Sequence, residues 1–520
     1  MVKIAARFWW VCLLLGWGID FLFWGKAPGI SFPIFITLIV LAGILLAAGE
    51  GARPARTSLL LLLPIGYFAV MSAIRLEGFT RFVGFWLTLG LLALLAVSFQ
   101  GGRWVVYRIW DYLAGMVRLG YDSLRLPAVL IGQNRKDRPV SGRRAVPYLR
   151  GALLAFPVLL LFIPLLSAAD PIFSRGVREV LEALRLETLV EYSFRSVYIL
   201  AGTYLLAGVY LHAITASDDR QRLKPAAPLP FSLGLIEAAI ILLCVNALFS
   251  VFVAVQFRYF FGGQGNISLE GFTFAEYARR GFGELVAVSL FSLLLFLGLS
   301  IIARRQSGSQ RRLFSLLGAW LVVLVSVILV SAFQRLLLYE QAYGFTRLRT
   351  YTHLYMIWLG VLLVAVLILE LSGRLRLFAL ALLVVSLGFG ATLNALNIDR
   401  FIVVQNVGRA LAGEELDVLY LGTLSNDAVP ALAQAFHSQP ADSALRDDLG
   451  GLLACRAALR ELRAAEYPWQ SYHLGRERAN SILRGMQPEL EEYPVETNSS
   501  GILTVNVKGE ARECYPPWED

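Results

Sequence analysis

Four ionisable residues at the start of one hydrophobic stretch have the types and spacing to do chemistry. Glu276, Arg280 and Glu284 follow one another at four-residue intervals, and Arg279 lies beside them. On a helix, this spacing places the three side chains on one face as an alternating-charge ladder. Such a ladder can bind a charged ligand, or supply an ion-coupling carboxylate where Glu284 enters a membrane. The commoner interpretation is a set of local ion pairs that anchors a helix end.

A second dense segment runs from residue 335 to residue 355. Basic groups beside aromatic rings suit an anionic head group or a glycan, and they equally suit an interfacial belt of Tyr and Arg, which is the commoner use. The candidate binding residues of the two segments, beyond the ladder, are Arg258, Arg335, Tyr339, Arg347 and Arg349, and Glu340 and His353 lie among them. A lone histidine is too little for a catalytic prediction.

Three polar residues interrupt apolar stretches elsewhere. They are Asp20, Glu237 and Asn246. Ionisable groups at membrane depth are costly and usually face a partner or a water-filled cavity. For each residue taken singly, pairing with a group on a neighbouring helix is the better interpretation. A polar route between Glu237 and Glu284 is the alternative.

Motifs that would indicate an enzyme are missing from the sequence. It contains no phosphate-binding GxxxxGK[ST], no HExxH, no GxSxG and no GxGxxG after a strand. Four histidines make a His-rich metal site improbable. We therefore predict no cofactor and no metal, and the sequence gives no basis for assigning an enzymatic activity.

The positions of the four cysteines separate into two kinds. Cys12 and Cys244 lie in apolar stretches and are most simply small core residues. Cys455 and Cys514 both lie in the more polar C-terminal part. If that part is outside the cytoplasm, these two can form a disulfide.

The elements that position these residues are transmembrane helices. Apolar residues make up 57% of the chain and charged residues 16%, against about 45–50% and about 25% in soluble domains. Crossing a bilayer takes about 20 apolar residues. We predict an all-α, polytopic bundle of about eleven spans, at 8–24, 30–48, 58–74, 82–98, 151–168, 197–214, 233–255, 281–302, 313–333, 352–371 and 375–395.

Four regions follow from this pattern. Residues 1–98 form a four-span segment, and residues 99–150 form a basic, amphipathic cytoplasmic segment suited to an anionic leaflet. Packing against other cytoplasmic loops is the alternative for that segment. Residues 151–396 form a seven-span core. Residues 397–520 form a small, mainly helical domain, with helices at 430–436, 443–465 and 475–486 and a short strand near 502–508.

The charge distribution sets the orientation. Residues 396–520 contain 11 Lys and Arg against 19 Asp and Glu, whereas the rest of the chain contains 36 basic and 19 acidic residues. Placing the N-terminus inside puts 23 of those 36 in cytoplasmic segments, as the positive-inside rule favours. An odd span count then places the C-terminal domain outside the cytoplasm. The scattered basic charge and the acidic C-terminal part argue against nucleic-acid binding.

Three blocks carry a resemblance to a known family. They are RYFFGG with FTFAEYARRGFGEL, LYEQAYGFTRLRTYTHLYMIW, and LNALNIDRFIVVQNV with LDVLYLGTLSNDAVPAL. In this order they resemble an uncharacterised family of bacterial polytopic membrane proteins, catalogued as domain-of-unknown-function 4173, and its close sister family. The resemblance covers about residues 150–440 and implies a bacterial inner membrane. It carries no activity, substrate or site residues.

Two classes of function remain open. The first is a non-enzymatic envelope scaffold or sensor that uses the outer segments 258–284 and 335–355, with the lipid bilayer, envelope proteins or anionic lipids as partners. The second is a transporter or channel-like protein that moves a small or charged solute. A transporter site is often built from discontinuous helices, and the spans lack paired Gly and Pro breaks. The sequence therefore favours the scaffold or sensor.

Overall fold

The computed structural model describes residues 6–136, 146–176, 186–219, 233–260, 282–304, 307–463, 467–498 and 501–515. This part of the chain is almost entirely helical, as predicted. The bundle begins with α1 (Ala6–Phe23), α2 (Ser31–Gly49), α3 (Arg56–Leu59), α4 (Leu62–Met71), α5 (Gly78–Ser98), α6 (Ile109–Lys136), α7 (Val146–Ala169) and α9 (Leu186–Thr215). It continues with α10 (Leu235–Phe260), α12 (Phe282–Ile302), α13 (Gly308–Tyr343), α14 (Arg347–Leu371) and α15 (Phe378–Leu396).

Eight of the described helices are long and apolar enough to cross a membrane. They lie at 31–49, 78–98, 190–215, 235–256, 283–302, 308–343, 347–371 and 375–396. A helix satisfies its own backbone hydrogen bonds, which is what a segment in hydrocarbon requires. All eleven predicted spans overlap helical segments, but three of them do not match one of these eight: 8–24 corresponds to α1, which is not among them, and 56–71 and 157–169 are shorter apolar helices. The polytopic helical fold is confirmed, and the count of eleven stays a prediction.

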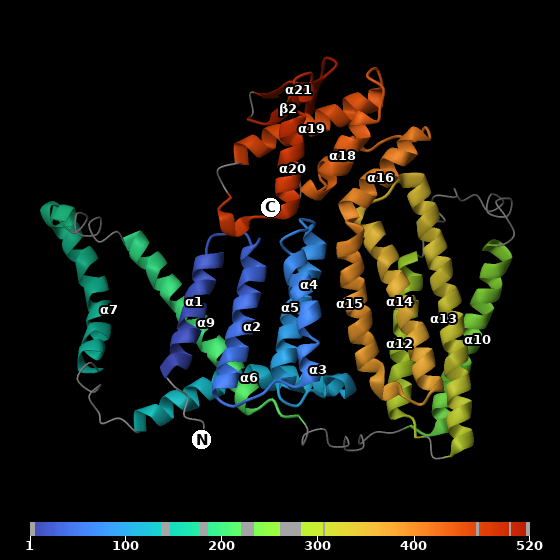
Figure 1. Cartoon of the computed structure of the whole chain (residues 1–520), viewed down its shortest axis with the longest axis horizontal. Coiled ribbons are helices and arrows are strands. Elements are labelled where there is room, and N and C mark those ends of the chain that lie inside the picture. Colours follow the sequence, from blue (N-terminus) through green and yellow to red (C-terminus); the bar gives the residue numbers. More distant parts are fainter. Residues whose placement is uncertain are drawn as a thin grey trace.

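The bundle helices lie side by side (Figure 1), and two hydrophobic cores divide them. One core joins α1, α2, α4, α5 and α9 around residues such as Phe68 and Tyr210. The other joins α10 and α12–α15 around Phe296 and Leu321. Leu387 of α15 packs against the first core while Val385 lies in the second. The contacts thus group α9 with the N-terminal helices, and the predicted division at residues 98 and 150 stays a prediction.

Two helices depart from this arrangement. α6 lies across the end of the bundle where the N-terminus is marked, and α7 stands apart from the other helices (Figure 1). α6 exposes Trp110, Leu113, Val117 and Leu124, whose spacing of three, four and seven residues places them on one helix face. An exposed apolar face on a helix that lies across a bundle end is what a membrane-surface helix requires.

The C-terminal domain covers the opposite end of the bundle (Figure 1). It consists of α16 (Ile398–Leu411), α17 (Val418–Gly422), α18 (Val429–His437), α19 (Ala444–Arg463), α20 (Leu474–Gly485), α21 (Gln487–Leu490), β1 (Val495–Thr497), β2 (Leu503–Val507) and β3 (Glu510–Glu513). Its core contains Leu432, Phe436 and Leu453, and this core continues into the bundle through Leu354 and Leu393. The domain is therefore packed on the helices rather than tethered to them.

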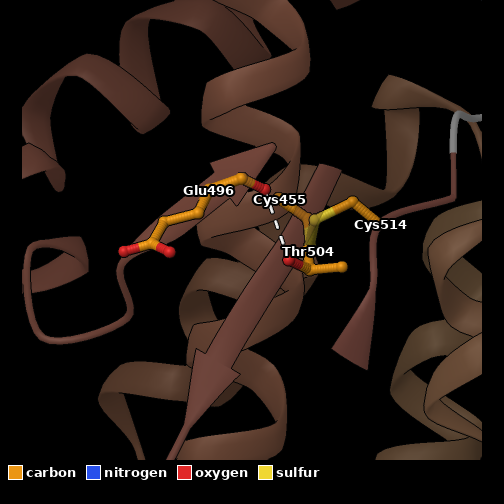
Figure 2. The surroundings of a disulfide bond; sticks show 4 residues. All are labelled: Cys455, Glu496, Thr504 and Cys514. Carbon is orange, nitrogen blue, oxygen red and sulfur yellow. Dashed lines mark hydrogen bonds between the residues drawn. A yellow bond between two sulfur atoms is a disulfide. The ribbon is translucent and has the colours of Figure 1, made fainter. Parts of the chain in front are cut away.

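A small sheet closes the C-terminal domain. β2 lies between β1 and β3, and both pairings are antiparallel. Cys455 of α19 is joined to Cys514, just after β3, by a disulfide with a Cα–Cα distance of 5.4 Å (Figure 2). Beside it, Thr504 Oγ1 donates a hydrogen bond to the carbonyl of Glu496, which ties β2 to β1. A link across 59 residues stabilises a fold by about 4 kcal/mol in the loop-entropy model.

Three sequence expectations need correction. The segment 335–355 is not an outer loop: α13 continues to Tyr343 and α14 begins at Arg347. The polar residues of this segment, which follow the predicted span 313–333, pair inside the protein. Cys12 is buried as expected, but Cys244 is exposed on the bundle surface. The helix of the sixth span, predicted at 197–214, begins at Leu186 and is therefore longer than predicted.

Candidate functional site

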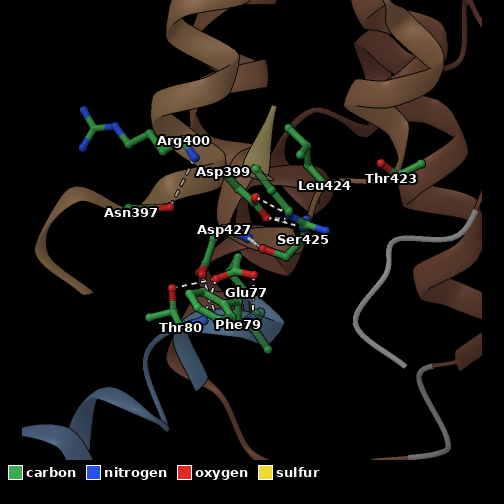
Figure 3. A network of polar contacts seen from close by, with 12 residues as sticks. Glu77, Phe79, Thr80, Asn397, Asp399, Arg400, Thr423, Leu424, Ser425 and Asp427 are labelled. Atoms are coloured by element: carbon green, nitrogen blue, oxygen red, sulfur yellow. Dashed lines mark hydrogen bonds and ion pairs between the residues drawn. The ribbon is translucent and has the colours of Figure 1, made fainter. Parts of the chain in front are cut away.

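A buried ion pair joins the bundle to the C-terminal domain. Arg347, the first residue of α14, donates from Nε and Nη2 to the two carboxylate oxygens of Asp399 at 2.7 and 2.6 Å. Asp399 is fully buried and also accepts a hydrogen bond from the backbone N–H of Ser425 at 2.7 Å (Figure 3). Two parallel charge-assisted bonds fix the orientation of both partners. The contact therefore sets how α14, α16 and the start of the C-terminal domain lie together.

The chain reaches this contact through a tight turn between α15 and α16. Asn397 has a positive φ of 52°, a left-handed conformation that asparagine tolerates better than most residues. Its side chain accepts a hydrogen bond from the backbone N–H of Arg400 at 3.2 Å and so caps α16. The cap leaves Asp399 directed inward and Arg400 directed away from the ion pair (Figure 3).

A second carboxylate organises the same junction. Glu77 is buried and caps α5 by accepting from the backbone N–H groups of Phe79 and Thr80 at 2.8 and 2.7 Å (Figure 3). The hydroxyl of Tyr351 on α14 donates a hydrogen bond to Oε1 of Glu77. The preceding amide, Leu76 N–H, donates to Asp427 of the C-terminal domain at 2.8 Å. One short loop is thus tied to α14 and to the C-terminal domain.

Backbone hydrogen bonds complete the docking. Ile30 N–H donates to the carbonyl of Tyr472, and Leu474 N–H donates to the carbonyl of Ala73, both at 2.9 Å. Between them, Nε2 of His473 donates to the carbonyl of Pro28 at 2.9 Å. Burial, with the nearby positive charge of an arginine as a smaller cause, lowers the pKa of His473 to about 4. This seam is therefore built for a neutral imidazole.

A separate polar cluster lies in the second core near the same end of the bundle. Arg335 Nη2 donates to Gln256 of α10 at 2.9 Å, and Ser331 donates to the same oxygen at 3.1 Å. His353 Nδ1 lies 3.1 Å from a carboxylate oxygen of Glu340, which is fully buried. Within the described chain, neither oxygen of Glu340 accepts a hydrogen bond of normal geometry. A buried carboxylate of this kind inside a helix bundle is a candidate functional group.

The predicted charge ladder lies mostly outside the described residues. This applies to Glu276, Arg279 and Arg280, and to the side chain of Arg258. Glu284 is exposed in the first turn of α12. Whether the ladder forms stays a prediction.

The remaining candidates of the second segment are held within the protein. The guanidinium of Arg349 lies over the ring of Tyr339, 4.2 Å from its centroid, and donates to the carbonyl of Tyr343 at 3.2 Å. Such a cation–π contact is worth about 0.5–2 kcal/mol. Together with the pairing of Arg347 and Arg335, it shows the segment to be a set of internal contacts at two helix ends.

Two of the three polar candidates in the predicted spans have structural partners. Asp20 of α1 accepts two hydrogen bonds from Arg195 of α9, at 3.0 and 2.7 Å. The amide of Asn246 donates to the carbonyl of Leu317 on α13 at 3.0 Å. Glu237, by contrast, is exposed at the start of α10. The pairs bridge neighbouring helices, as buried polar groups in a bundle are expected to do.

Sequence reasoning missed the carboxylates that matter most at the junction. Asp399 and Asp427 lie in a block that resembles other proteins, but their partners are far away in sequence: Arg347 is separated from Asp399 by 52 residues and Leu76 from Asp427 by 351. The one indication that the sequence offered was the position of Asp399. Asp399 directly follows an apolar span, where an unpaired acid would be costly.

Comparison with known families adds one match. A family model described as "Domain of unknown function (DUF4153)" matches residues 62–435, which is more than half of the 520 residues. The match agrees with the resemblance to an uncharacterised family, although the family matched is not domain-of-unknown-function 4173. The comparisons with curated proteins and with solved structures gave no match.

Proposed function

Since this chain belongs to the family of domain of unknown function DUF4153, whose description names no activity, we propose its function from the structure: a non-enzymatic scaffold or sensor of the bacterial envelope. In this account the protein spans the inner membrane with its N-terminus and α6 on the cytoplasmic side. The C-terminal domain faces the extracytoplasmic side. The partners are envelope proteins or anionic lipids, met by that domain and by the segment 258–284.

The observation that carries the proposal is the docking of the C-terminal domain on the bundle. A domain that only needs to be near the membrane can hang from a linker. Here the buried Arg347–Asp399 pair and the backbone bonds of Ile30 and Leu474 join it to three separate parts of the bundle. Such joints transmit position from one side of the membrane to a domain on the other, or hold a binding surface at a fixed height.

Two further features support the proposed orientation. The end of the bundle that carries α6 is the end opposite the C-terminal domain (Figure 1), so the basic amphipathic segment and the acidic domain are separated. The disulfide between Cys455 and Cys514 suits an oxidising compartment such as the periplasm. Both agree with the excess of basic residues on the proposed cytoplasmic side.

A transporter remains the second candidate because of Glu340. Its buried carboxylate beside His353 resembles the kind of group that exchanges protons in a coupled transporter. The Asp20–Arg195 pair and the Asn246–Leu317 contact argue the other way, since both bridge neighbouring helices. We therefore keep the scaffold or sensor as the proposal.

Thiol accessibility separates the two functions. Cys12 and Cys244 are the free cysteines, so replacing these two by Ala leaves a background in which the disulfide is intact. Single cysteines placed at Glu237, Glu284 and Asn246 are then probed with a membrane-impermeant thiol reagent in right-side-out and inverted vesicles. A cysteine at Leu316, which is 65% exposed on the bundle surface, controls for reagent that enters lipid.

The scaffold or sensor predicts one-sided labelling. Position 284 reacts only from outside, position 237 only from inside, and position 246 reacts no more than position 316. Labelling of position 246 from either side, at a rate that changes with added solute or with pH, would mean that water reaches the middle of the bundle. That outcome would overturn the proposal in favour of a transporter.

A further inference from the structure

A cavity lies in the seam between the bundle and the C-terminal domain, and neither Arg347 nor Asp399 lines it. Its volume is about 270 Å³, enough for roughly nine water molecules at about 30 Å³ each. Three arginines from three different elements line it: Arg75 from the loop between α4 and α5, Arg400 from α16 and Arg478 from α20. The fold thus brings together arginines that lie about 400 positions apart in the sequence.

The positive charge in this cavity is not balanced. Asp427 is the one carboxylate among the residues that line the cavity, and one of its oxygens already accepts from the Leu76 amide. The three guanidinium groups therefore leave a net charge of about two positive units. Like charges that share a cavity repel one another unless an anion enters. The two amide side chains that line it, Asn397 and Gln434, can donate further hydrogen bonds.

The arginines are also available. Arg75 donates from Nε to the carbonyl of Asn394 at 2.8 Å. This hydrogen bond fixes the side chain and leaves the two terminal nitrogens of the guanidinium available to an anion. Within the described residues, no hydrogen bond or ion pair engages the guanidinium of Arg400 or Arg478. The contrast lies on α20 itself, where Arg476 donates to the carbonyl of Ser471 and Arg484 pairs with Glu477.

We infer that this cavity binds a phosphate-bearing anion. The guanidinium fork matches the geometry of phosphate oxygens and binds them with two parallel hydrogen bonds. Arg400 lies in the first turn of α16, whose N-terminal partial positive charge adds to the attraction. The cavity lies where bundle helices end, so the phosphate can belong to a lipid head group or to a free solute. The inference does not depend on whether the protein is a scaffold, a sensor or a transporter.

The test compares two double variants that remove the same charge. Arg400→Gln with Arg478→Gln empties the cavity of its two unengaged guanidinium groups, and Arg75 is left because it holds Asn394. Arg374→Gln with Arg484→Gln is the control, since Arg374 is exposed at the other end of the bundle and Arg484 is exposed on α20. The full-length protein is stripped of lipid until native mass spectrometry shows no adduct. It is then titrated calorimetrically with inorganic phosphate and with short-chain phosphatidylglycerol.

We expect the wild-type protein to bind at least one probe saturably, and the cavity variant to bind it at least about tenfold more weakly. The control variant should keep its affinity to within about twofold. Saturable binding of phosphate alone identifies a solute site, and binding of the lipid identifies a head-group site. Failure of both probes to bind the wild type, or an equal loss in both variants, would overturn the inference.

Discussion

Breaking the Arg347–Asp399 pair should release the C-terminal domain from the bundle. The Asp399 side chain is fully buried and that of Arg347 is 13% exposed. Removing one partner of such a pair costs about 3–5 kcal/mol, because the other charge stays buried without compensation. Asp399→Ala also leaves the Ser425 amide without its acceptor, so this variant should lie at the upper end of that range. Arg347→Ala should lie lower.

The double variant gives the coupling energy between the two side chains, which decides whether they act as a pair. Replacing both residues by Ala removes both charges, so its cost should fall well short of the sum of the two single costs. We expect a coupling energy of about 2–3 kcal/mol for a pair in direct contact. If Asp399→Ala does not fold, Asp399→Asn keeps an acceptor for Ser425 and still removes the charge, and the cycle can be run with it.

Pulse proteolysis in increasing urea, in detergent, measures the stability of the C-terminal domain in each variant. The exposed pair of Glu477 and Arg484, with side chains 48% and 59% exposed, is the control and should give a coupling of about 0–1 kcal/mol. The reasoning is refuted if the effects of Arg347 and Asp399 add to within about 0.5 kcal/mol, because the two side chains would then not act as a pair.

Three further predictions concern the same domain. Reduction of the disulfide, or Cys455→Ser with Cys514→Ser, should lower its stability by about 4 kcal/mol, and an unchanged urea midpoint with reductant would contradict this. The free energy of unfolding should fall by about 3 kcal/mol as the pH falls from about 6.5 to about 4. Over this range the unfolded state binds a proton at His473, whereas the native state binds none there until about pH 4. His473→Gln should flatten this pH profile. Gly29→Ala places a methyl group 2.5 Å from a backbone carbonyl of the domain and should cost about 1–3 kcal/mol, whereas Gly90→Ala, which meets nothing within 4 Å, should not destabilise.

The membrane part of the fold could be predicted because its physics is local. A long apolar run that must satisfy its own backbone can only be a helix, and α10, α12 and α15 begin and end within a few residues of their predicted bounds. Local signals also served the C-terminal domain. The predicted helices at 430–436, 443–465 and 475–486 correspond to α18, α19 and α20.

What could not be predicted depends on contacts between distant residues. β1 and β3 have the sequences VET and EARE, and both are largely exposed, so neither carries the alternation that marks a half-buried strand. Arg335 and Glu340 were placed in an outer loop because polar residues lower hydropathy. Their burial requires Gln256 and His353 from other helices, and no window along the chain contains those partners.

The candidate sites divide in the same way. The sequence singled out Arg347 and Arg349, but as groups for an external ligand, whereas the structure pairs both internally. The cavity arginines at 75, 400 and 478 were not selected, because only the packing of the C-terminal domain on the bundle brings them together.

Amide hydrogen exchange at the seam tests the central claim that the C-terminal domain is docked on the bundle. The two amides to follow are those of Ile30 and Leu474, which donate across the seam, in full-length protein held in lipid nanodiscs. A docked domain predicts that both exchange as slowly as the interior of α18, because they open only when the seam opens. Exchange at the rate of an exposed loop, with α18 still protected, would mean that the domain is merely tethered and would contradict the account.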